Sequence, residues 1–158
     1  MLTQNGINFL GFALYRCTTF FVDMDGNEQS NSDSNSKNFM TNSSNRRFYV
    51  GTGNTEPTIN DYSMDILNND LTQLSMVSYP NNSSGYFPSG TGTDKNLSCI
   101  MSFTATYKNN TENPITIKEI GAGVYLSSSY DILLAREVLE TPVTIEPNKT
   151  YSFSITIS

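Results

Sequence analysis

Five carboxylates are the side chains of this sequence best suited to acid–base chemistry. They are Asp23, Asp25, Asp61, Asp65 and Glu119. In principle any two of them could flank a glycosidic bond as acid and base. Their local sequences favour structural roles instead: Asp23 and Asp25 lie in a turn, where aspartate bonds to the backbone, and Asp61 fits the start of a helix. We therefore expect no catalytic residue among them.

The histidine and cysteine content of the sequence also argues against catalysis and metal binding. The sequence has no histidine, so the commonest general base and the commonest metal ligand are both absent. Cys17 and Cys99 lack CxxC spacing and lie in apolar segments, where free cysteine behaves as a small buried hydrophobe. Sequence alone leaves open whether these two cysteines pair. We expect a protein that is not an enzyme and that holds no metal and no cofactor.

Three short motifs have a chemical and a structural interpretation. "DMDGNE", from Asp23, resembles the start of a calcium loop, but the glutamate of position twelve is missing, and a hairpin turn at Asp25-Gly26 is favoured. "GTGNT" and "GTGTDK" lack the GxxxxGK[ST] pattern of a phosphate loop. Arg46-Arg47 is the only basic pair. We interpret it as two solvated side chains at the start of a strand rather than as an anion contact.

The charge balance excludes further classes of function. Nine basic and fifteen acidic residues give a net charge of −6, whereas nucleic-acid binding needs a basic footprint. The apolar run in "MLTQNGINFLGFALYRC" is too short to span a bilayer, and no basic region precedes it. We expect neither a signal peptide nor a membrane anchor, and no nucleic acid or membrane as a partner.

The elements that must position these side chains are β-strands, because short runs alternate between polar and apolar residues. We expect strands over Phe9–Val22, Phe48–Val50, Leu71–Tyr79, Cys99–Tyr107, Ile115–Leu126, Ile132–Leu139 and Thr150–Ser158. Residues 58–67 are expected to form one or two helical turns. Turn signals between the strands predict an all-β fold, an antiparallel β-sandwich of immunoglobulin-like or jelly-roll-like type. The sandwich domain should span residues 46–158, after an N-terminal extension over 1–45 that contains a β-hairpin and a polar loop or arm.

The same alternation predicts the core. The inward residues should include Phe103, Ala105, Ile117, Val124, Leu134, Phe153 and Ile155, and the last strand should also bury Tyr151 and Ile157. A change of parity at Lys118-Glu119 predicts a β-bulge that turns Ile120 inward while Glu119 faces out. Pro142 is excluded from a central ladder position, and "EPNK" has the form of a type I turn.

Three stretches together resemble a group of tailed-bacteriophage virion proteins: "FYVGTGNTEPTINDYSMD", "FTATYKNNTENPITIKEIGAG" and "LLAREVLETPVTIEPNKTYSFSITI". In that group a glycine-threonine-glycine turn leads to a proline and an "ND" segment, and an "EIG" strand is followed by an "LLAR" strand and a "PVTI" turn. The resemblance covers Phe48 to Ser158. Gly51 and Gly53 would permit positive φ, and Arg136 and Glu137 would lie on opposite sides of their strand, so that one of them could face a neighbouring subunit.

The resemblance implies a non-enzymatic structural component of a tailed phage virion, made in the cytoplasm of the host bacterium. Such a component assembles with copies of itself and with other virion proteins, in the tail, the baseplate or the neck and collar. One alternative is a head (capsid) decoration or fibre protein. Another is a host-receptor or glycan-binding module, in which Tyr79, Tyr86 and Phe87 would be stacking surfaces. Those aromatic rings could equally pack under their own loop or against a neighbouring subunit.

The last strand raises the question of its partner. Thr150 to Ser158 has no proline, charge or bulge, and these are the devices that usually protect an exposed edge. It should therefore lie inside the sheet or be covered by a neighbouring subunit. The segment Gln29–Asn45 is too polar to order alone, so we expect it to lie across an adjacent subunit. Both features predict a homo-oligomer or a repeated ring or lattice component, with an interface of roughly 2,000 Å² or more in total.

Overall fold

The computed structural model describes residues 1–8, 19–31, 45–67, 70–79, 101–126 and 130–157. In these residues it has eight strands and one short helical segment, residues 4–8. The strands are β1 (Thr19–Val22), β2 (Glu28–Asn31), β3 (Arg46–Gly51), β4 (Leu71–Tyr79), β5 (Met101–Asn109), β6 (Ile115–Leu126), β7 (Tyr130–Ile145) and β8 (Thr150–Ile157). The expected all-β class is confirmed.

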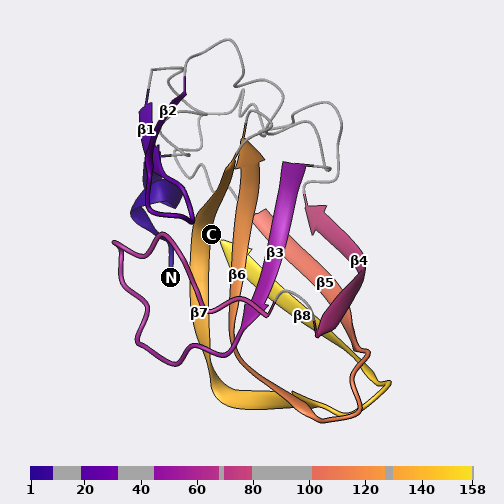
Figure 1. Cartoon of the computed structure of the whole chain (residues 1–158). Coiled ribbons are helices and arrows are strands. Elements are labelled where there is room, and N and C mark those ends of the chain that lie inside the picture. The colour runs from indigo at the N-terminus through magenta and orange to yellow at the C-terminus, as the bar shows by residue number, and fades with distance from the viewer. Residues whose placement is uncertain (9–18, 32–44, 68–69, 80–100, 127–129, 158) are drawn as a thin grey trace, which may run out of the picture.

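Two three-stranded antiparallel sheets form the sandwich. One has the order β3-β6-β7 and the other β4-β5-β8. Figure 1 shows β5 and β8 crossing behind β3 and β6. The hairpin of β1 and β2 is a separate two-stranded sheet beside the β7 edge of the sandwich. Both the β-sandwich and the N-terminal hairpin of the extension are confirmed.

Alternation predicted the buried faces well. All seven expected inward residues are at most 4% exposed: Phe103, Ala105, Ile117, Val124, Leu134, Phe153 and Ile155. The prediction for Tyr151 was wrong, because this residue is 45% exposed. It lies at the beginning of β8, where its ring contacts Phe153 at a centroid distance of 4.9 Å. Ile157 is only partly buried.

The buried residues form two clusters, and the smaller one attaches the hairpin. Phe21 from β1 packs with Val124, Ile132 and Leu134, apart from the core between the two sheets. A register shift leaves Leu134 without a partner on β6, since Ala122 pairs with Ala135 and Gly123 with Leu133. Two of the seven predicted core residues therefore hold the N-terminal hairpin rather than the opposite sheet.

Two turns differ from their predicted types. The β1–β2 connection is a five-residue loop between Val22 and Glu28, and in it Gly26 has a positive φ of 86°. The hairpin turn predicted at Asp25-Gly26 is therefore present, but of these two residues only Gly26 has the predicted positive φ. In "EPNK" the amide of Lys149 donates to the carbonyl of Glu146 at 3.0 Å. Asn148, its third residue, has a φ of 62°, which makes the turn type II rather than type I.

Residues 52–66, which we call the covering loop, contain no helix, so the predicted helical turns were wrong. The loop leaves the end of β3 and passes across the outer face of the β3-β6-β7 sheet (Figure 1). It returns to β3, where Ile66 bridges Gly51. Pro142 lies in the part of β7 that has no partner on β6, as expected.

Several expectations fall outside the described residues. They concern Cys17 and Cys99, Tyr86 and Phe87, the strand over residues 9–18, and most of the segment 29–45. Tyr79 is the last residue of β4.

Candidate functional site

Glu119 on β6 points away from the core, because Ile120 beside it points inward. It does not face solvent, however: the covering loop lies over it and Glu119 is 0% exposed. Its Oε1 accepts hydrogen bonds from the backbone amides of Gly53 at 3.0 Å and Asp65 at 2.8 Å. The expectation that Glu119 faces out was therefore wrong with respect to solvent, because this carboxylate is bonded to the loop above it.

Arg136 on β7 completes the bonding of Glu119. Its Nε donates to Glu119 Oε2 at 2.6 Å. Its Nη1 donates to Asp61 Oδ2 at 2.6 Å, and its Nη2 donates to Thr55 Oγ1 at 3.1 Å. The side chain is 5% exposed, so Arg136 faces the covering loop. Glu137, on the other side of the strand, is the exposed member of the pair.

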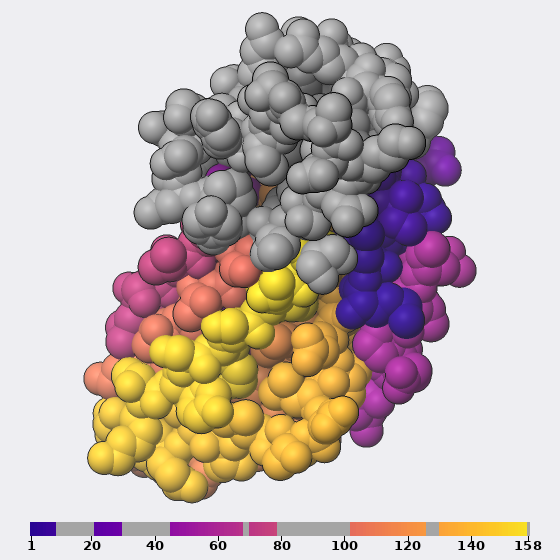
Figure 2. Space-filling view, turned by 180° about the vertical axis from the view of Figure 1, so that it is seen from behind, coloured from indigo at the N-terminus to yellow at the C-terminus, as the bar shows by residue number. Residues whose placement is uncertain are grey.

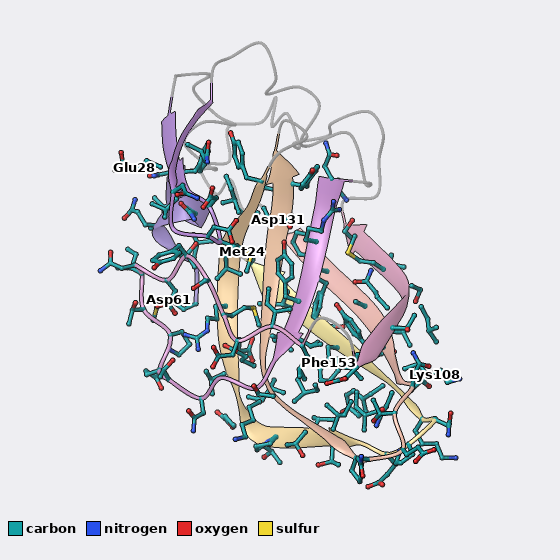
Figure 3. All side chains as sticks on the ribbon, in the orientation of Figure 1. Met24, Glu28, Asp61, Lys108, Asp131 and Phe153 are labelled. Carbon is teal, nitrogen blue, oxygen red and sulfur yellow. The ribbon has the colours of Figure 1, made fainter. Side chains whose placement is uncertain are left out.

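Asp61 carries the contacts predicted for a helix start, but without a helix. Its carboxylate accepts from the Thr58 hydroxyl at 2.7 Å and from the Thr58 amide at 3.1 Å. Burial by itself would raise the pKa of Asp61, but the hydrogen bonds from Thr58 and Arg136 outweigh burial and lower that pKa. The ion pair with Arg136 ties Asp61, labelled on the covering loop in Figure 3, to strand β7.

The glycines of the "GTG" and "EIG" motifs make room for these groups. A Cβ at Gly51 would lie 2.6 Å from Glu119 Oε1, and a Cβ at Gly53 would lie 2.8 Å from Glu119 Cδ. At Gly121 a Cβ would lie 2.6 Å from the sulfur of Met64. The predicted positive φ at Gly51 and Gly53 was wrong, since neither has one. Close approach of the loop and the Glu119 side chain is what requires glycine there.

The Glu119 cluster, defined as Glu119, Arg136, Asp61, Thr55 and Thr58, is thus where the motifs behind the resemblance meet. "GTG" and "ND" lie in one stretch of the sequence and "EIG" and "LLAR" in two later ones, and each supplies a residue of the cluster or the space for one. Both carboxylates are bonded to Arg136, and Glu119 is inaccessible to any substrate. Physically, the cluster attaches the covering loop to the sheet.

The other candidate carboxylates do not join Glu119 in an acid–base pair. Asp23 closes the β1–β2 loop, accepting from the amides of Asp25 and Asn27 and from Gln29 Nε2. Burial would raise the pKa of Asp23, but these hydrogen bonds lower it. Asp25 and Asp65 are exposed. The hairpin interpretation of "DMDGNE" therefore accounts for Asp23, whose carboxylate serves the backbone.

The two arginines of the basic pair differ. Arg46 is 9% exposed, and its Nη1 donates to Ser78 Oγ on β4, so the solvated side chain expected at this position was wrong. Burial lowers its pKa. Arg47 lies on the outer face, with its guanidinium 4.9 Å from the centroid of the Tyr125 ring and its Nε 3.4 Å from Asp131 Oδ1.

Two hollows lie near the hairpin. One, of about 370 Å³, lies between residues 4–8, the hairpin and the covering loop, and its lining includes Asp61 and Tyr62. The other, of about 260 Å³, lies between the β1–β2 loop and the outer face of the β3-β6-β7 sheet. We call it the tyrosine hollow, because its walls include Tyr49, Tyr125 and Tyr130, together with Asp25 and Asp131. Met24 and Asp131 lie beside each other at this point in Figure 3.

The sheet edges are protected unequally. Ile66 bridges β3, and Leu2 bridges β7 at Ala135. On β4 a register shift at Leu74 interrupts the ladder. β8 pairs with β5 over eight consecutive residues without interruption, and among the described residues nothing pairs with its other side. Among the described residues β8 is therefore an edge strand rather than an inner one, and the other predicted arrangement, coverage by a neighbouring subunit, stays a prediction.

The outer face of β5 and β8 is a ladder of hydroxyl groups. Ser102 bonds to Thr156 at 3.2 Å, Thr104 to Ser154 at 2.8 Å, and Thr106 to Ser152 at 2.8 Å. These three pairs are uncharged, and the next pair on the same face, Lys108 with Thr150, places one lysine at its end. Figure 2 shows β8, in yellow, open to the viewer on the rear of the molecule.

No three acidic or thiol side chains of the described residues gather as a metal site would require, and none of the described helices is long and apolar enough to cross a membrane. Comparison of the chain with family models, with curated proteins and with solved structures finds no match.

Proposed function

We propose that this protein is a non-enzymatic structural component of a tailed phage virion, which assembles with copies of itself through the β8 edge. The observation that carries the proposal is β8 itself. Within the part of the chain that the structure describes, β8 is the one of the four sandwich edges whose strand has neither a bridge nor a bulge. Its sequence TYSFSITI contains no charge and no proline. Exposed strands of this kind recruit another strand unless they are protected.

A second copy suits this edge electrostatically. Two chains that each carry −6 repel each other, and the repulsion is smallest where the contact surface has no charge. The hydroxyl ladder beside β8 is such a surface. Pairing of the β8 strands of two copies would join their three-stranded sheets into one continuous sheet. Backbone hydrogen bonds between the two strands would supply the affinity.

The Glu119 cluster supports the non-enzymatic part of the proposal. Its carboxylates are bonded to Arg136 and to backbone amides, so they hold a loop rather than face a substrate. The position in the particle that we favour is the tail, the baseplate or the neck and collar, with other virion proteins as further partners. A head decoration or fibre protein remains the alternative, since it would use the same edge.

The experiment compares two lysine variants of the purified full chain by size-exclusion chromatography with light scattering. Ser154→Lys places a charge on the β8 edge, and Thr104→Lys places the same charge on its hydrogen-bonded partner in the central strand β5. We expect the natural chain and Thr104→Lys to form oligomers and Ser154→Lys to be monomeric. A natural chain that is monomeric at high micromolar concentration, or a Ser154→Lys variant that assembles normally, would rule out the β8 interface.

A further inference from the structure

The core-facing side of β8 is covered unevenly. Phe153 and Ile155 are each 4% exposed, whereas Tyr151 on the same side of the strand is 45% exposed. The Tyr151 ring contacts Phe153 at a centroid distance of 4.9 Å, and among the described residues no strand pairs with the free edge of β8. Tyrosine combines a large apolar ring with a polar tip and is enriched at interfaces for that reason. A further strand beside β8 would cover the exposed part of this ring.

The symmetry of the contact determines the direction of that strand. When two identical copies meet through the same edge, a two-fold axis lies between them. If the axis is perpendicular to the sheet, the strands are antiparallel and both copies keep their core-facing sides on the same side of the joined sheet. An axis along the strands would make them parallel, but it would turn Phe153 and Ile155 of one copy to the outer side. The burial pattern of β8 therefore favours antiparallel pairing.

The alternation of β8 limits the register. Residues directly opposite each other in an antiparallel pair have their side chains on the same face. In β8 the core-facing residues have odd numbers and the outward hydroxyl residues have even numbers. A slip by one residue would pair Tyr151 with Thr156 of the partner subunit and so place apolar and polar side chains on one face. The two-fold axis must therefore pass through a residue position and not between two positions.

One register pairs all the core-facing residues of β8 with one another. With the axis at Ser154, residues equally distant from Ser154 along the two strands lie opposite each other. Tyr151 then faces Ile157 of the partner subunit, and Phe153 faces the partner's Ile155. Ile157 is only partly buried in the single chain. The two incompletely covered residues at the ends of β8 would therefore cover each other.

The neighbouring registers are less favourable. With the axis at Phe153, Lys149 comes opposite Ile157 of the partner subunit, which sets a charge against an apolar side chain at the edge of the core. With the axis at Ile155, Tyr151 lies beyond the last strand residue of the partner subunit, so its ring stays exposed. The axis at Ser154 avoids both defects.

We propose that two copies of this chain pair through antiparallel β8 strands about a two-fold axis at Ser154, with Tyr151 of each copy covered by Ile157 of the partner subunit. This inference rests on the proposed assembly through β8 and adds the direction and the register of the contact. Both copies use the same edge, so the contact is isologous and closes at two copies. A larger ring or lattice then needs a second interface.

Cysteine cross-linking of the purified full chain measures the register. Ser154→Cys, at the axis, lies opposite the same position of the partner subunit, and Ser152→Cys lies opposite Thr156→Cys. Directly opposite Cβ atoms are about 4.5–5.5 Å apart, and diagonal neighbours are further away, so mild oxidation favours disulfides between opposite positions. Mass spectrometry of the digested dimer identifies the joined peptides, which distinguishes the introduced thiols from Cys17 and Cys99.

We expect Ser154→Cys to form a link between the two copies of position 154. A mixture of Ser152→Cys and Thr156→Cys should form a link between these two positions, whereas neither variant alone should form one within β8. If a mixture of Ser152→Cys and Ser154→Cys gives a link between positions 152 and 154, the axis is at Phe153 and the register is wrong, although assembly through β8 stands. A natural chain that is monomeric in light scattering, or dimers without any link within β8, would overturn the assembly itself.

Tyr151→Ala tests whether the partner subunit covers this ring. The dissociation constant of the dimer, measured by analytical ultracentrifugation, should rise about tenfold or more, because each dimer loses two aromatic rings from the contact. Tyr62→Ala is the matched control, since Tyr62 on the covering loop is 43% exposed, and it should leave the dissociation constant unchanged. If Tyr151→Ala lowers only the melting temperature and the dimer dissociates as before, the ring has a structural role within one chain and the proposal is wrong.

Discussion

The Glu119→Ala substitution should be among the most destabilising single changes in this protein. It removes the acceptor of three hydrogen bonds, from Gly53, Asp65 and Arg136. Removing one partner of a buried ion pair costs about 3–5 kcal/mol, and each buried amide left unpaired adds about 1–3 kcal/mol. Arg136 keeps Asp61 as a partner, and the freed loop amides can regain water. These two effects place the expected loss in unfolding free energy at about 3–5 kcal/mol.

Urea unfolding followed by far-UV circular dichroism measures this loss, provided that the dependence of unfolding free energy on urea is the same in both proteins. Glu137→Ala is the matched control. Glu137 is exposed on the neighbouring strand, so its removal should change stability by less than about 0.5 kcal/mol. Hydrogen exchange adds a local measurement, because the amides of Gly53 and Asp65 should lose protection in Glu119→Ala. A loss below about 1 kcal/mol would refute the view that Glu119 attaches the covering loop.

Two further predictions concern the core and the pH dependence. Phe153→Ala should lower the free energy of unfolding, measured in urea, by about 3–5 kcal/mol, because Phe153 is 4% exposed in the core between the sheets. A loss below about 2 kcal/mol would show that the two sheets do not pack tightly around this ring. Stability should also fall in acid, because hydrogen bonds outweigh burial and lower the pKa of both Asp61 and Asp23 below the ordinary value of 3.8. The stabilisation from a lowered carboxylate pKa is fully present above the unfolded pKa and is lost as pH falls through the folded one. The urea concentration at the unfolding midpoint should therefore decrease as the pH is lowered below about 4, and it should decrease less in Asp61→Asn than in the natural chain. An equal decrease in both proteins would contradict the role given to Asp61.

The sequence predicted the buried faces of the sandwich because strand alternation is a local property. Phe103 and Ala105 on β5, and likewise Phe153 and Ile155 on β8, are two positions apart. The strand pleat therefore places both members of each pair on the same face. Alternation fails where tertiary contacts decide burial. Glu119 looked solvent-facing because nothing near it in sequence indicates that residues 52–66 lie over it.

The Glu119 cluster could not be derived from any single stretch, since its ion pairs join residues that are far apart in the chain. A signal was nevertheless present: the glycines of "GTG" and "EIG", the "ND" aspartate and the "LLAR" arginine belong to the same resemblance. Each had been given a local interpretation, such as positive φ at Gly51 and Gly53. One feature explains all of these residues: the buried carboxylate of Glu119 needs hydrogen-bond partners, and it needs glycines that leave space for it.

The turns show a similar limit. "EPNK" has proline in second position, which types I and II share. Asn148 then decides between them, because asparagine tolerates the positive φ of type II. In the β1–β2 loop the Asp-Gly pair predicted the hairpin and the positive φ of Gly26. It did not predict that the Asp23 carboxylate accepts hydrogen bonds from the amides of Asp25 and Asn27.

The assembly through β8 is tested most directly by hydrogen exchange of the natural chain at low and high protein concentration. An edge strand that pairs with a second copy gains hydrogen bonds on its free side. The amides of β8 should therefore exchange more slowly at high concentration, while those of β4, the opposite edge of the same sheet, should not change. If the β8 amides exchange at the same rate at both concentrations while light scattering shows an oligomer, the copies meet elsewhere and the central claim is contradicted.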